Sequence, residues 1–455
     1  MINDLANATD ALALLAFKQQ IRRDPVHPLG TWNDSLPFCQ WQGITCGRHH
    51  PHRVVAKNLT GLQLVGPLSP FIANLFTPFL RVIDLSDNEL HGQIPQEFGR
   101  LFRLRDLNLS YNAMTGEIPA KLTYCWRLRI ISFSFNKLAG KIPIEIGSLS
   151  RLKRLFIASN YLTGSIPTSL GNLSSLTLFS IGSNELEGNI PKQLGQLRNL
   201  YYFLTYENKL SGTIPPTLFN LSSIAVISVS ANQLSGSLPP NLGVTLPNLV
   251  EFYVGGNQFT GPIPISMSNA SRLEQLDLGS NQFSGSIPTN LGRLGGLLRL
   301  NLEDNLFGSG EADDMTSLSS LTNCSFLEKL SVVHNQLAGA LPSSLTNLST
   351  NLESLHLSEN QITGSIPTGI DNLFNLIYLG MSFNLMTGQI PEYIKKLPYL
   401  QYLNLSYNDF EGQVPQEGIF KNTSAVSVIG NRKLCGGSPA LLLPTCPSQD
   451  SKKQR

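Results

Sequence analysis

Histidines are the first residues to consider, because three of them lie close enough together in the sequence to suggest a metal site. His49, His50 and His52 occur in a short segment bounded by Arg48 and Arg53. A structural zinc site needs four converging ligands, and no such set of cysteines and histidines is evident here. We interpret the segment as a solvated loop that leads into the first strand, and we expect no metal ion.

Acidic residues are the second candidates for chemistry, because two neighbouring carboxylates can serve as general acid and general base. The pairs Glu303-Asp304 and Asp313-Asp314 are such candidates, but neither has a companion acid–base group. The phosphate-binding loop, the nucleophile elbow and the His-Glu-x-x-His helix are all missing from the sequence. We therefore expect a binding protein rather than an enzyme, with no cofactor.

The six cysteines fall into two close pairs and two isolated residues, which are Cys39 with Cys46, Cys435 with Cys446, and Cys125 and Cys324. The close pairs lie near the two ends of the chain, and each could close a small terminal cap in an oxidising compartment. The isolated cysteines both occur in the phrase Leu-Thr-x-Cys-x-x-Leu. We expect these two to be small buried hydrophobic residues rather than nucleophiles or metal ligands.

The composition favours a large buried core and argues against a nucleic-acid-binding protein. The 455 residues include 33 lysines and arginines against 31 aspartates and glutamates, a net charge of +2. Nucleic-acid binding needs a strongly basic surface, which this balance does not indicate. Hydrophobic residues make up 41% of the chain, so the 38 glycines and 28 prolines indicate many turns rather than disorder.

No apolar run in the sequence is long enough to cross a membrane, and the longest run near the N-terminus extends only from Ala11 to Phe17. Acidic rather than basic residues precede this run, so it does not resemble a signal peptide. We expect an amphipathic helix that is capped by Thr9 or Asp10 and continues to Ile21. We therefore expect neither an export signal nor a membrane anchor within this chain.

Export from the cell is nevertheless indicated by the density of Asn-x-Ser/Thr sites, which accept N-glycans in secreted proteins. A repeat rich in leucine, serine and asparagine could also generate such sites by composition alone. Together with the paired cysteines, the sites favour passage through the secretory pathway. The eleven candidate asparagines are Asn7, Asn33, Asn58, Asn108, Asn172, Asn220, Asn269, Asn323, Asn347, Asn404 and Asn422.

The strongest signal in the sequence is a repeat centred on an asparagine, with the phrase Leu-x-x-Leu-x-Leu-x-x-Asn-x-Leu-x-Gly-x-Ile-Pro. The spacing is 24 residues ten times, 25 twice and 30 once, and a degenerate first copy with Leu62 in the asparagine position brings the total to about 15 repeats. The fourteen asparagines are Asn88, Asn112, Asn136, Asn160, Asn184, Asn208, Asn232, Asn257, Asn281, Asn305, Asn335, Asn360, Asn384 and Asn408.

Each part of the phrase predicts a structural feature. The Leu-x-Leu alternation predicts a short strand with one buried face. One copy cannot bury its apolar edge alone, so the copies should stack into a solenoid around a shared core. We expect the asparagines to form a polar ladder, each bonding backbone groups of the following turn in its own copy and in the next. The glycine permits a tight turn, and Ile-Pro should begin a second short extended segment.

Three features depart from the phrase. Lys57 occupies a strand position that is apolar in every later copy, so its burial would be costly and we expect it to extend toward solvent at the cap. Thr205 replaces a core leucine, which places a hydroxyl where an apolar side chain is expected. The insertion Thr77-Pro78 lengthens the first spacing.

The phrase resembles the plant-specific leucine-rich repeat, and both ends resemble the caps of plant receptor-like kinase ectodomains. The front matches through the cysteine segment from Phe38 to Cys46, and the back through the segment from Gly430 to Gly437. The long repeat from Gly308 to Cys324 resembles the subfamily that contains the bacterial elongation-factor-peptide receptor and the rice blight-resistance receptor. The resemblance covers essentially all of residues 5–447.

The resemblance implies an α/β leucine-rich-repeat solenoid in a curved superhelix with disulfide-closed caps. It places an N-terminal cap at 1–53, the solenoid at 54–418, a C-terminal cap at 419–447 and a juxtamembrane-like tail at 448–455. It implies an ectodomain that senses a peptide or protein ligand for immune signalling, with a leucine-rich-repeat co-receptor kinase as a further partner. The location would be the outer face of the plasma membrane or the apoplast, and the kinase is not in this chain.

Binding is expected on the concave face, where the residues between the strand leucines should point outward. Exposed aromatic residues with an arginine are typical binding anchors, although outward aromatics also suit strands in general. The residues that we expect to contact a peptide are Arg154, Phe156, Tyr202, Leu204, Tyr206, Glu207, Glu251 and Tyr253. Glycans on Asn108 or Asn404 would stand on the same face, so the ligand should avoid those repeats.

Two other functions remain open at this point. A secreted inhibitor of microbial wall-degrading enzymes would share the repeat, but such inhibitors resemble this chain less in length and lack its long repeat around Gly308. A truncated copy without a partner would account for Lys57, Thr205 and the missing ends. An inhibition assay on such enzymes separates the first alternative from a receptor, and a cooperatively melting secreted product would argue against the second.

Overall fold

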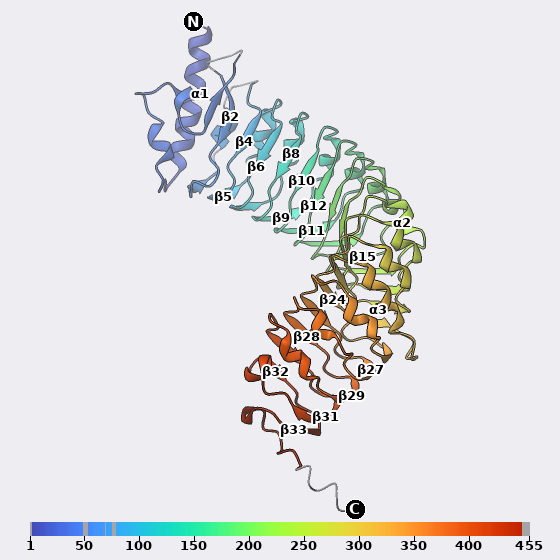
Figure 1. The fold of residues 1–455 in the computed structure, drawn as a ribbon. Helices are drawn as coiled ribbons and strands as arrows, with labels where there is room; N and C mark the ends of the chain where they lie inside the picture. The colour runs from blue at the N-terminus through green and yellow to red at the C-terminus, as the bar shows by residue number, and fades with distance from the viewer. Residues whose placement is uncertain (1, 49–52, 69, 75–78, 448–455) are drawn as a thin grey trace, which may run out of the picture. The chain divides into compact units, whose positions relative to one another are not determined.

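The computed structural model describes residues 2–48, 53–68, 70–74 and 79–447. Contacts divide the chain into two compact units, Met1–Leu234 and Ser235–Arg455. Each unit is a stack of similar coils, in which a strand, a turn, a second short strand and a 3₁₀ helix follow one another (Figure 1). This arrangement confirms the predicted leucine-rich-repeat solenoid. The histidine segment at 49–52, the insertion at 77–78 and the tail at 448–455 lie outside the described residues.

The first strand of each coil belongs to a parallel sheet, in which equivalent residues of consecutive coils lie side by side. Leu107 pairs with Ile131, and Ile131 pairs with Leu155, so the buried leucine positions form a continuous row. The strands of the first unit are β1 (Ile44–Cys46, antiparallel to β2), β2 (Val54–Asn58), β4 (Val82–Asp84), β6 (Asp106–Asn108), β8 (Ile130–Ser132), β10 (Arg154–Phe156), β12 (Leu178–Ser180), β14 (Tyr202–Leu204) and β16 (Val226–Ser228). Those of the second unit are β18 (Glu251–Tyr253), β20 (Gln275–Asp277), β22 (Arg299–Asn301), β24 (Lys329–Ser331), β26 (Ser354–His356), β28 (Tyr378–Gly380), β30 (Tyr402–Asn404) and β32 (Val426–Ser427).

The second short strand of each coil follows the asparagine and pairs in parallel with its equivalents. These strands are β3 (Val65–Pro67), β5 (Glu89–Gln93), β7 (Ala113–Gly116), β9 (Lys137–Lys141), β11 (Tyr161–Ser165), β13 (Glu185–Asn189), β15 (Lys209–Gly212), β17 (Gln233–Ser237), β19 (Gln258–Gly261), β21 (Gln282–Gly285), β23 (Leu306–Phe307), β25 (Ala338–Ala340), β27 (Gln361–Gly364), β29 (Leu385–Gln389), β31 (Asp409–Val414) and β33 (Lys433–Gly436). Among the described strands, the row stops at β23 and resumes at β25, where the sequence spacing is 30 residues. The extra residues of this coil include a short helix, α3 (Thr316–Ser320).

Helices occupy the opposite side of the coils. The α-helices are α1 (Ile2–Gln20), α2 (Leu242–Thr245) and α3. The 3₁₀ helices are η1 (Pro28–Thr31), η2 (Phe38–Gln40), η3 (Pro70–Asn74), η4 (Gln96–Arg100), η5 (Ala120–Tyr124), η6 (Ile144–Ser148), η7 (Thr168–Asn172), η8 (Lys192–Gln196), η9 (Leu218–Asn220), η10 (Ile265–Asn269), η11 (Thr289–Arg293), η12 (Leu321–Asn323), η13 (Ser343–Asn347), η14 (Ile370–Asn372), η15 (Glu392–Lys396), η16 (Gly418–Lys421) and η17 (Pro439–Leu441). The prediction that Ile-Pro begins the second strand is therefore wrong, because Ile-Pro follows that strand. Pro95, for example, follows β5 and precedes η4, where its extended backbone and missing N–H suit the start of a helix.

The asparagine ladder is present in both units, with one difference from the prediction. Asn136 donates from Nδ2 to the carbonyl oxygens of Phe133 and Ser134 in its own coil, over 3.0 and 3.3 Å. It also donates to Leu109 O over 2.9 Å and accepts from Met114 N over 2.9 Å, and both of these residues belong to the preceding coil. The ladder therefore links each coil to the one before it rather than to the next. The asparagine follows the turn, so the carbonyls within reach of its side chain belong to residues that precede it in the sequence.

Sequence reasoning missed one member of the ladder in the C-terminal cap. Asn431 follows Asn408 by 23 residues and is buried. Its Oδ1 accepts from Phe410 N over 3.0 Å, and its Nδ2 donates to Leu405 O and Val428 O over 2.9 Å each. The ladder thus extends into the cap. The spacing of Asn431 from Asn408, close to the 24 residues of the repeat, was the signal that could have indicated it.

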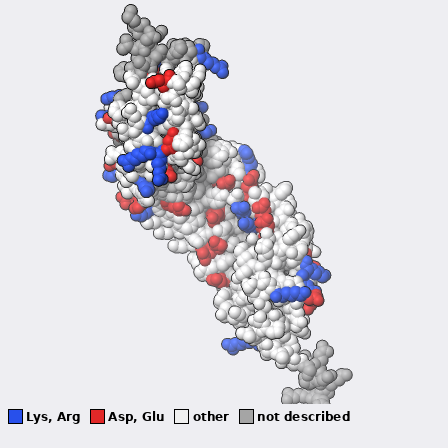
Figure 2. All heavy atoms as spheres, turned by 90° about the vertical axis from the view of Figure 1, so that its left-hand side faces the viewer, with Lys and Arg blue, Asp and Glu red and all other residues white. Residues whose placement is uncertain are grey.

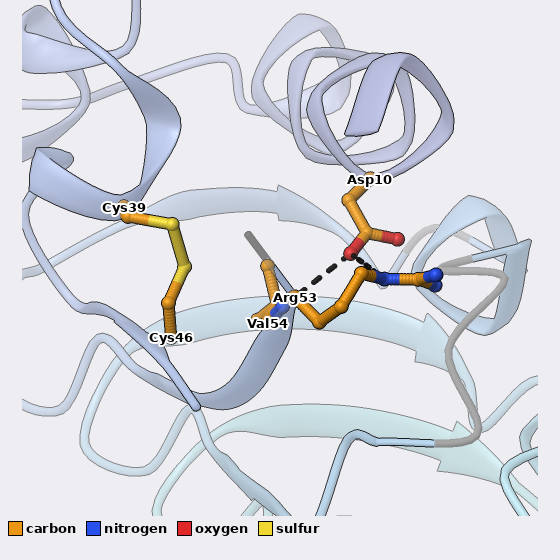
Figure 3. Close-up of a disulfide and its surroundings, with 5 residues drawn as sticks. All are labelled: Asp10, Cys39, Cys46, Arg53 and Val54. Atoms are coloured by element: carbon orange, nitrogen blue, oxygen red, sulfur yellow. Dashed lines mark hydrogen bonds and ion pairs between the residues drawn. A yellow bond between two sulfur atoms is a disulfide. The ribbon is translucent and has the colours of Figure 1, made fainter. Parts of the chain in front are cut away.

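Both predicted disulfides are present, and each lies within a terminal cap. Cys39–Cys46 has a Cα–Cα distance of 5.5 Å, and Cys435–Cys446 has one of 4.9 Å. Close to the first disulfide, the Asp10 carboxylate accepts from Arg53 Nε over 3.2 Å and from Val54 N over 3.3 Å (Figure 3). These bonds tie α1 to the start of β2. Asp10 is thus a residue within α1 rather than its cap, because the helix begins at Ile2.

Lys57 is completely buried, so the prediction that it reaches solvent is wrong. Its Nζ lies 3.0 Å from the centre of the Phe17 ring and 5.2 Å from that of Trp32, and it has no hydrogen-bond partner. A ring face offers about 2 kcal/mol to a desolvated ammonium group, which is less than the cost of desolvating it. Burial therefore lowers the pKa of Lys57 well below its ordinary value. Helix α1 and Trp32 cover the side chain and keep its ammonium group from contact with solvent.

Candidate ligand-binding surface

The structure offers little for catalysis among the residues it describes. Burial raises the pKa of the Cys125 thiol to about 12 and that of Cys324 to about 11, so neither forms a reactive thiolate. In the described part of the chain, no group of three histidine, cysteine or acidic side chains is placed to hold a metal ion. No helix there is long and apolar enough to span a bilayer.

A shallow hollow of about 340 Å³ lies on the strand face of the first unit. Four aromatic residues line it, from three different positions in the repeat: Tyr111, Phe135, Phe156 and Tyr206. Its floor consists of small and polar side chains, which are Ser86, Asn108, Ser110, Ser132, Ser134, Ala158 and Ser180. Some of these hydroxyls bond one another, as Ser110 and Ser132 do over 2.7 Å. A surface of aromatic walls with hydroxyl groups between them can hold apolar side chains and bond an extended backbone.

Tyr206 is held against the sheet by the backbone of the adjacent coil. A Cβ atom on Gly182 would lie only 2.7 Å from ring atoms of Tyr206, so the ring rests directly on this glycine. The glycine at this position is therefore needed for the orientation of the ring. An alanine there would push the Tyr206 ring away from the floor of the hollow.

Sequence reasoning missed Tyr111 and Phe135, although both precede a ladder asparagine. Their rings stack with centres 4.3 Å apart and planes inclined by 11°, and the side chains are 54% and 46% exposed. Both residues have a left-handed backbone, with φ of 54° and 56°. The alternation of side chains along a strand does not extend to residues with a left-handed backbone, so the strand pattern did not predict which way these two side chains point. The aromatic type at two consecutive copies of this position was the available signal.

The structure brings only some of the predicted binding residues together. Phe156 and Tyr206 line the hollow. Leu204 is half-buried and pairs in register with Ser180, and Arg154 and Tyr202 are exposed at the starts of β10 and β14. The predicted residues in the first unit also include Glu207, which is exposed and accepts a hydrogen bond from Ser183 Oγ.

Glu251 and Tyr253 belong to the second unit and form surroundings of their own. Tyr253 is half-buried and donates from its hydroxyl to Gln275 Oε1 over 2.7 Å. Burial, followed by the negative charge of Glu251, raises the pKa of Tyr253 to about 12, so this hydroxyl remains a donor. Another aromatic stack in this unit joins His356, Tyr378 and Tyr402, with ring centres 4.1 and 4.6 Å apart.

Candidate glycosylation sites gather on the helix side of the coils. Five of them, Asn172, Asn220, Asn269, Asn323 and Asn347, are exposed and end a 3₁₀ helix. Three further exposed sites are Asn33, Asn58 and Asn422. Asn108 and Asn404 are half-buried on the strand face, and the side chain of Asn7 lies outside the described residues. The Nδ2 of Asn108 donates to Asp84 and Ser86 over 3.2 and 3.1 Å, so the atom that a glycan would use is already engaged.

Family profiles match most of the chain. The profile described as "Leucine-rich repeat region" matches residues 72–305 and 202–434, and the one described as "Leucine rich repeat N-terminal domain" matches residues 7–47. The matched segments coincide with the coils and with the N-terminal cap that carries the Cys39–Cys46 disulfide.

Two curated relatives are plant receptor kinases. The chain is 48% identical over 101 residues to the LRR receptor-like serine/threonine-protein kinase EFR of Arabidopsis thaliana, a match that covers 22% of this chain and 10% of the relative. It is 45% identical over 86 residues to the receptor kinase-like protein Xa21 of Oryza sativa subsp. japonica, which covers 18% of this chain and 8% of the relative. The matches thus span about a tenth of the length of these relatives.

Solved structures of plant receptors share the fold over most of the chain. The plant peptide hormone receptor RGFR1, solved in complex with RGF2, has a TM-score of 0.71 at 30% identity and covers 84% of this chain and 63% of its own. The ectodomain of the Arabidopsis receptor kinase HAESA, in complex with an extended IDA peptide hormone, has a TM-score of 0.60 at 27% identity and covers 95% and 86%. From its repeats, caps and profile matches, the chain belongs to the leucine-rich-repeat family, and it resembles the ectodomains of plant leucine-rich-repeat receptor kinases.

Proposed function

We propose that this chain is the ligand-sensing ectodomain of a plant receptor kinase and that it binds an extended peptide on the strand face of its first unit. The observation that carries the proposal is the hollow with aromatic walls formed by Tyr111, Phe135, Phe156 and Tyr206. Its polar floor can bond a peptide backbone, while the rings accept apolar side chains. Similar receptors that bind peptide hormones support a peptide as the ligand class.

The proposal includes the setting in which the domain works. The resemblance of the long repeat to the subfamily of the bacterial elongation-factor-peptide receptor and the rice blight-resistance receptor favours a microbial peptide and a role in immune signalling. The exposed sequons and the two disulfides favour the extracellular face of the plasma membrane or the apoplast. A second leucine-rich-repeat kinase would act as co-receptor once the ligand is bound. The remaining predicted residues, Arg154, Tyr202, Leu204, Glu207, Glu251 and Tyr253, stay candidates for contacts beyond the hollow.

A displayed library of random peptides tests the proposal, because it contains extended peptides of every side-chain chemistry. The folded protein should enrich related sequences from the library, and the double variant F156A/Y206A should lose at least about tenfold in affinity for them, since buried aromatic anchors carry much of an interface's energy. The matched control is Y124A/Y161A, because Tyr124 and Tyr161 are also exposed but do not line the hollow. Equal affinity of the F156A/Y206A variant and the wild type would contradict the proposal.

A further inference from the structure

Four basic residues form a column where the strands of the first unit begin. Arg81, Arg105, Arg129 and Lys153 directly precede β4, β6, β8 and β10. The backbone N–H of each later member donates to the carbonyl of the one before it, over 2.7, 2.6 and 2.7 Å. The members therefore lie on neighbouring strands, about 4.8 Å apart. Figure 2 shows a group of lysine and arginine side chains in the upper part of the molecule, with acidic side chains beside it.

A second row of arginines lies beside this column. Arg127 and Arg151 lie over the ring of Trp126, with guanidinium carbons 4.5 and 4.8 Å from its centre. Arg103 lies 5.7 Å from the centre of the Phe79 ring. These ring contacts hold guanidinium groups in place without neutralising them. Arg154 is exposed at the start of β10 and adds a further positive charge.

These basic side chains have few partners for their charge. Among the residues that the structure describes, none of the eight forms an ion pair or a side-chain hydrogen bond, and the Nε of Arg127 is buried without a partner. Burial, followed by repulsion from Arg81, Arg129 and Arg127, lowers the pKa of Arg105. The carboxylate of Asp106 interacts electrostatically with Arg105, Arg129 and Arg154, but burial still raises its pKa. A surface of crowded cations without ion-pair partners among the described residues is complementary to a ligand that carries regularly spaced negative charges.

The fold does not require basic residues at this position. In the second unit the equivalent column includes Glu274, Leu298, Glu328 and Glu353, which are joined by the same backbone hydrogen bonds over 2.8 Å, and it continues to Ile377 and Gln401. The solenoid therefore accepts acidic, apolar and basic residues here alike. The basic column of the first unit thus reflects something other than folding.

We infer that this column and its second row bind a linear polyuronate, an acidic polysaccharide with one carboxylate on each sugar ring. A six-membered sugar ring is similar in width to the strand spacing, so such a chain lying across the strands places about one sugar over each coil. Its carboxylates can then face the column and its second row in turn. An extended peptide rises only about 3.3 Å per residue, so consecutive acidic side chains would fall out of register with the coils. Guanidinium groups bind carboxylates through paired, charge-assisted hydrogen bonds. Exposed Phe102, which precedes Arg103, offers an apolar surface at the edge of the same patch.

Binding of polygalacturonate oligomers to the whole chain tests this inference, in low salt and with a chelator to prevent gelling. The wild type should bind them, and the affinity should fall steeply as salt is added, because screening weakens contacts between exposed charges. The variant R81Q/R105Q/R129Q/K153Q should lose at least about tenfold in affinity. The matched control R198Q/R272Q/R299Q/K329Q also removes four positive charges, all from exposed side chains outside the column, and should bind like the wild type.

Three outcomes would overturn the inference. One is equal affinity of the column variant and the control variant. Another is undiminished binding of fully methyl-esterified oligomers, which keep the sugar backbone but lack the charge. The third is equally tight binding of poly-glutamate or single-stranded DNA, which would indicate a general polyanion surface. The residues differ from those of the hollow, so this experiment and the peptide selection can fail separately.

Discussion

At the scale of single residues, two of the three departures from the repeat, Lys57 and Thr205, are buried polar groups without partners. The Nζ of Lys57 and the Oγ1 of Thr205 are buried and have no hydrogen bond. Sequence alone identified both as unusual, because an apolar residue occupies these positions in other copies. It could not show that Lys57 is trapped, since that depends on how α1 and Trp32 close over it. Each residue is expected to reduce stability, and each leads to a prediction.

Replacement of Lys57 by methionine should raise the free energy of unfolding at pH 7 by about 1–3 kcal/mol, the usual cost of a buried unpaired polar group. It should also remove a pH dependence. In the folded wild type the pKa of Lys57 lies below 10.5, its ordinary value, which we take for the unfolded chain. Between these two pKa values the unfolded chain binds a proton that the folded chain does not. Stability should therefore rise with pH in this window and fall as the solution becomes more acidic.

Urea unfolding at several pH values below 10.5 measures both effects of the Lys57 substitution. The control is K137M, because Lys137 is exposed and should show neither effect. A K57M variant that is less stable than the wild type, with an unchanged pH dependence, would show that the folded protein keeps this ammonium charged against the Phe17 ring.

Replacement of Thr205 by valine should raise the free energy of unfolding by about 1 kcal/mol, because it removes an unbonded buried hydroxyl and keeps the shape of the side chain. The matched control is T177V, since Thr177 Oγ1 donates to Lys153 O over 3.0 Å and should gain nothing. Thermal melting of the two variants beside the wild type compares them. A destabilised T205V protein would mean that the hydroxyl has a partner.

At the scale of the elements, the asparagine ladder joins neighbouring coils. Asn160 donates to Phe133 O, Ile157 O and Ala158 O, and it accepts from Leu138 N over 2.9 Å. The sequence predicted the ladder and its spacing. It did not predict that each asparagine bonds the preceding coil, because that depends on where the turn lies relative to the strand. The same reason explains why Ile-Pro follows the second strand instead of beginning it.

Replacement of Asn160 by alanine should lower the free energy of unfolding by about 3 kcal/mol or more, because the backbone groups that it bonds are left unpaired inside the core. The exposed Asn199 provides the control, since N199A should change stability by no more than about 0.5 kcal/mol. Urea unfolding followed by circular dichroism compares the two variants. Similar stabilities for both would mean that water replaces the ladder bonds.

At the scale of the whole molecule, the repeat period predicted the solenoid, because each coil can be stable only when stacked on its neighbours. The two close cysteine pairs and the resemblance of both ends to known caps predicted the caps and the disulfides. The residues that line the hollow were predicted only in part. Phe156 and Tyr206 lie in the alternating pattern of the strands and were found. Tyr111 and Phe135 were missed because their left-handed backbone places them outside that pattern. The basic column was missed because the charge balance of the whole chain conceals a local excess.

Glycan occupancy should follow the exposure of the asparagines. When the chain is secreted from plant cells, we expect glycans on the five exposed sites that end 3₁₀ helices and none on Asn108, whose Nδ2 is hydrogen-bonded. Such a distribution would leave the strand face of the first unit accessible to a ligand. Peptide mass spectrometry before and after glycan removal measures it. A fully occupied Asn108 would instead place a glycan at the floor of the hollow.

The central claim is that a peptide binds in the hollow of the first unit, and hydroxyl-radical footprinting tests it most directly. A peptide selected from the library is added to the folded protein, and oxidation of aromatic side chains is measured by mass spectrometry with and without it. We predict protection of Tyr111, Phe135, Phe156 and Tyr206, with unchanged oxidation of Tyr161. Unchanged oxidation of the four hollow residues, with protection of other aromatic residues, would contradict the claim.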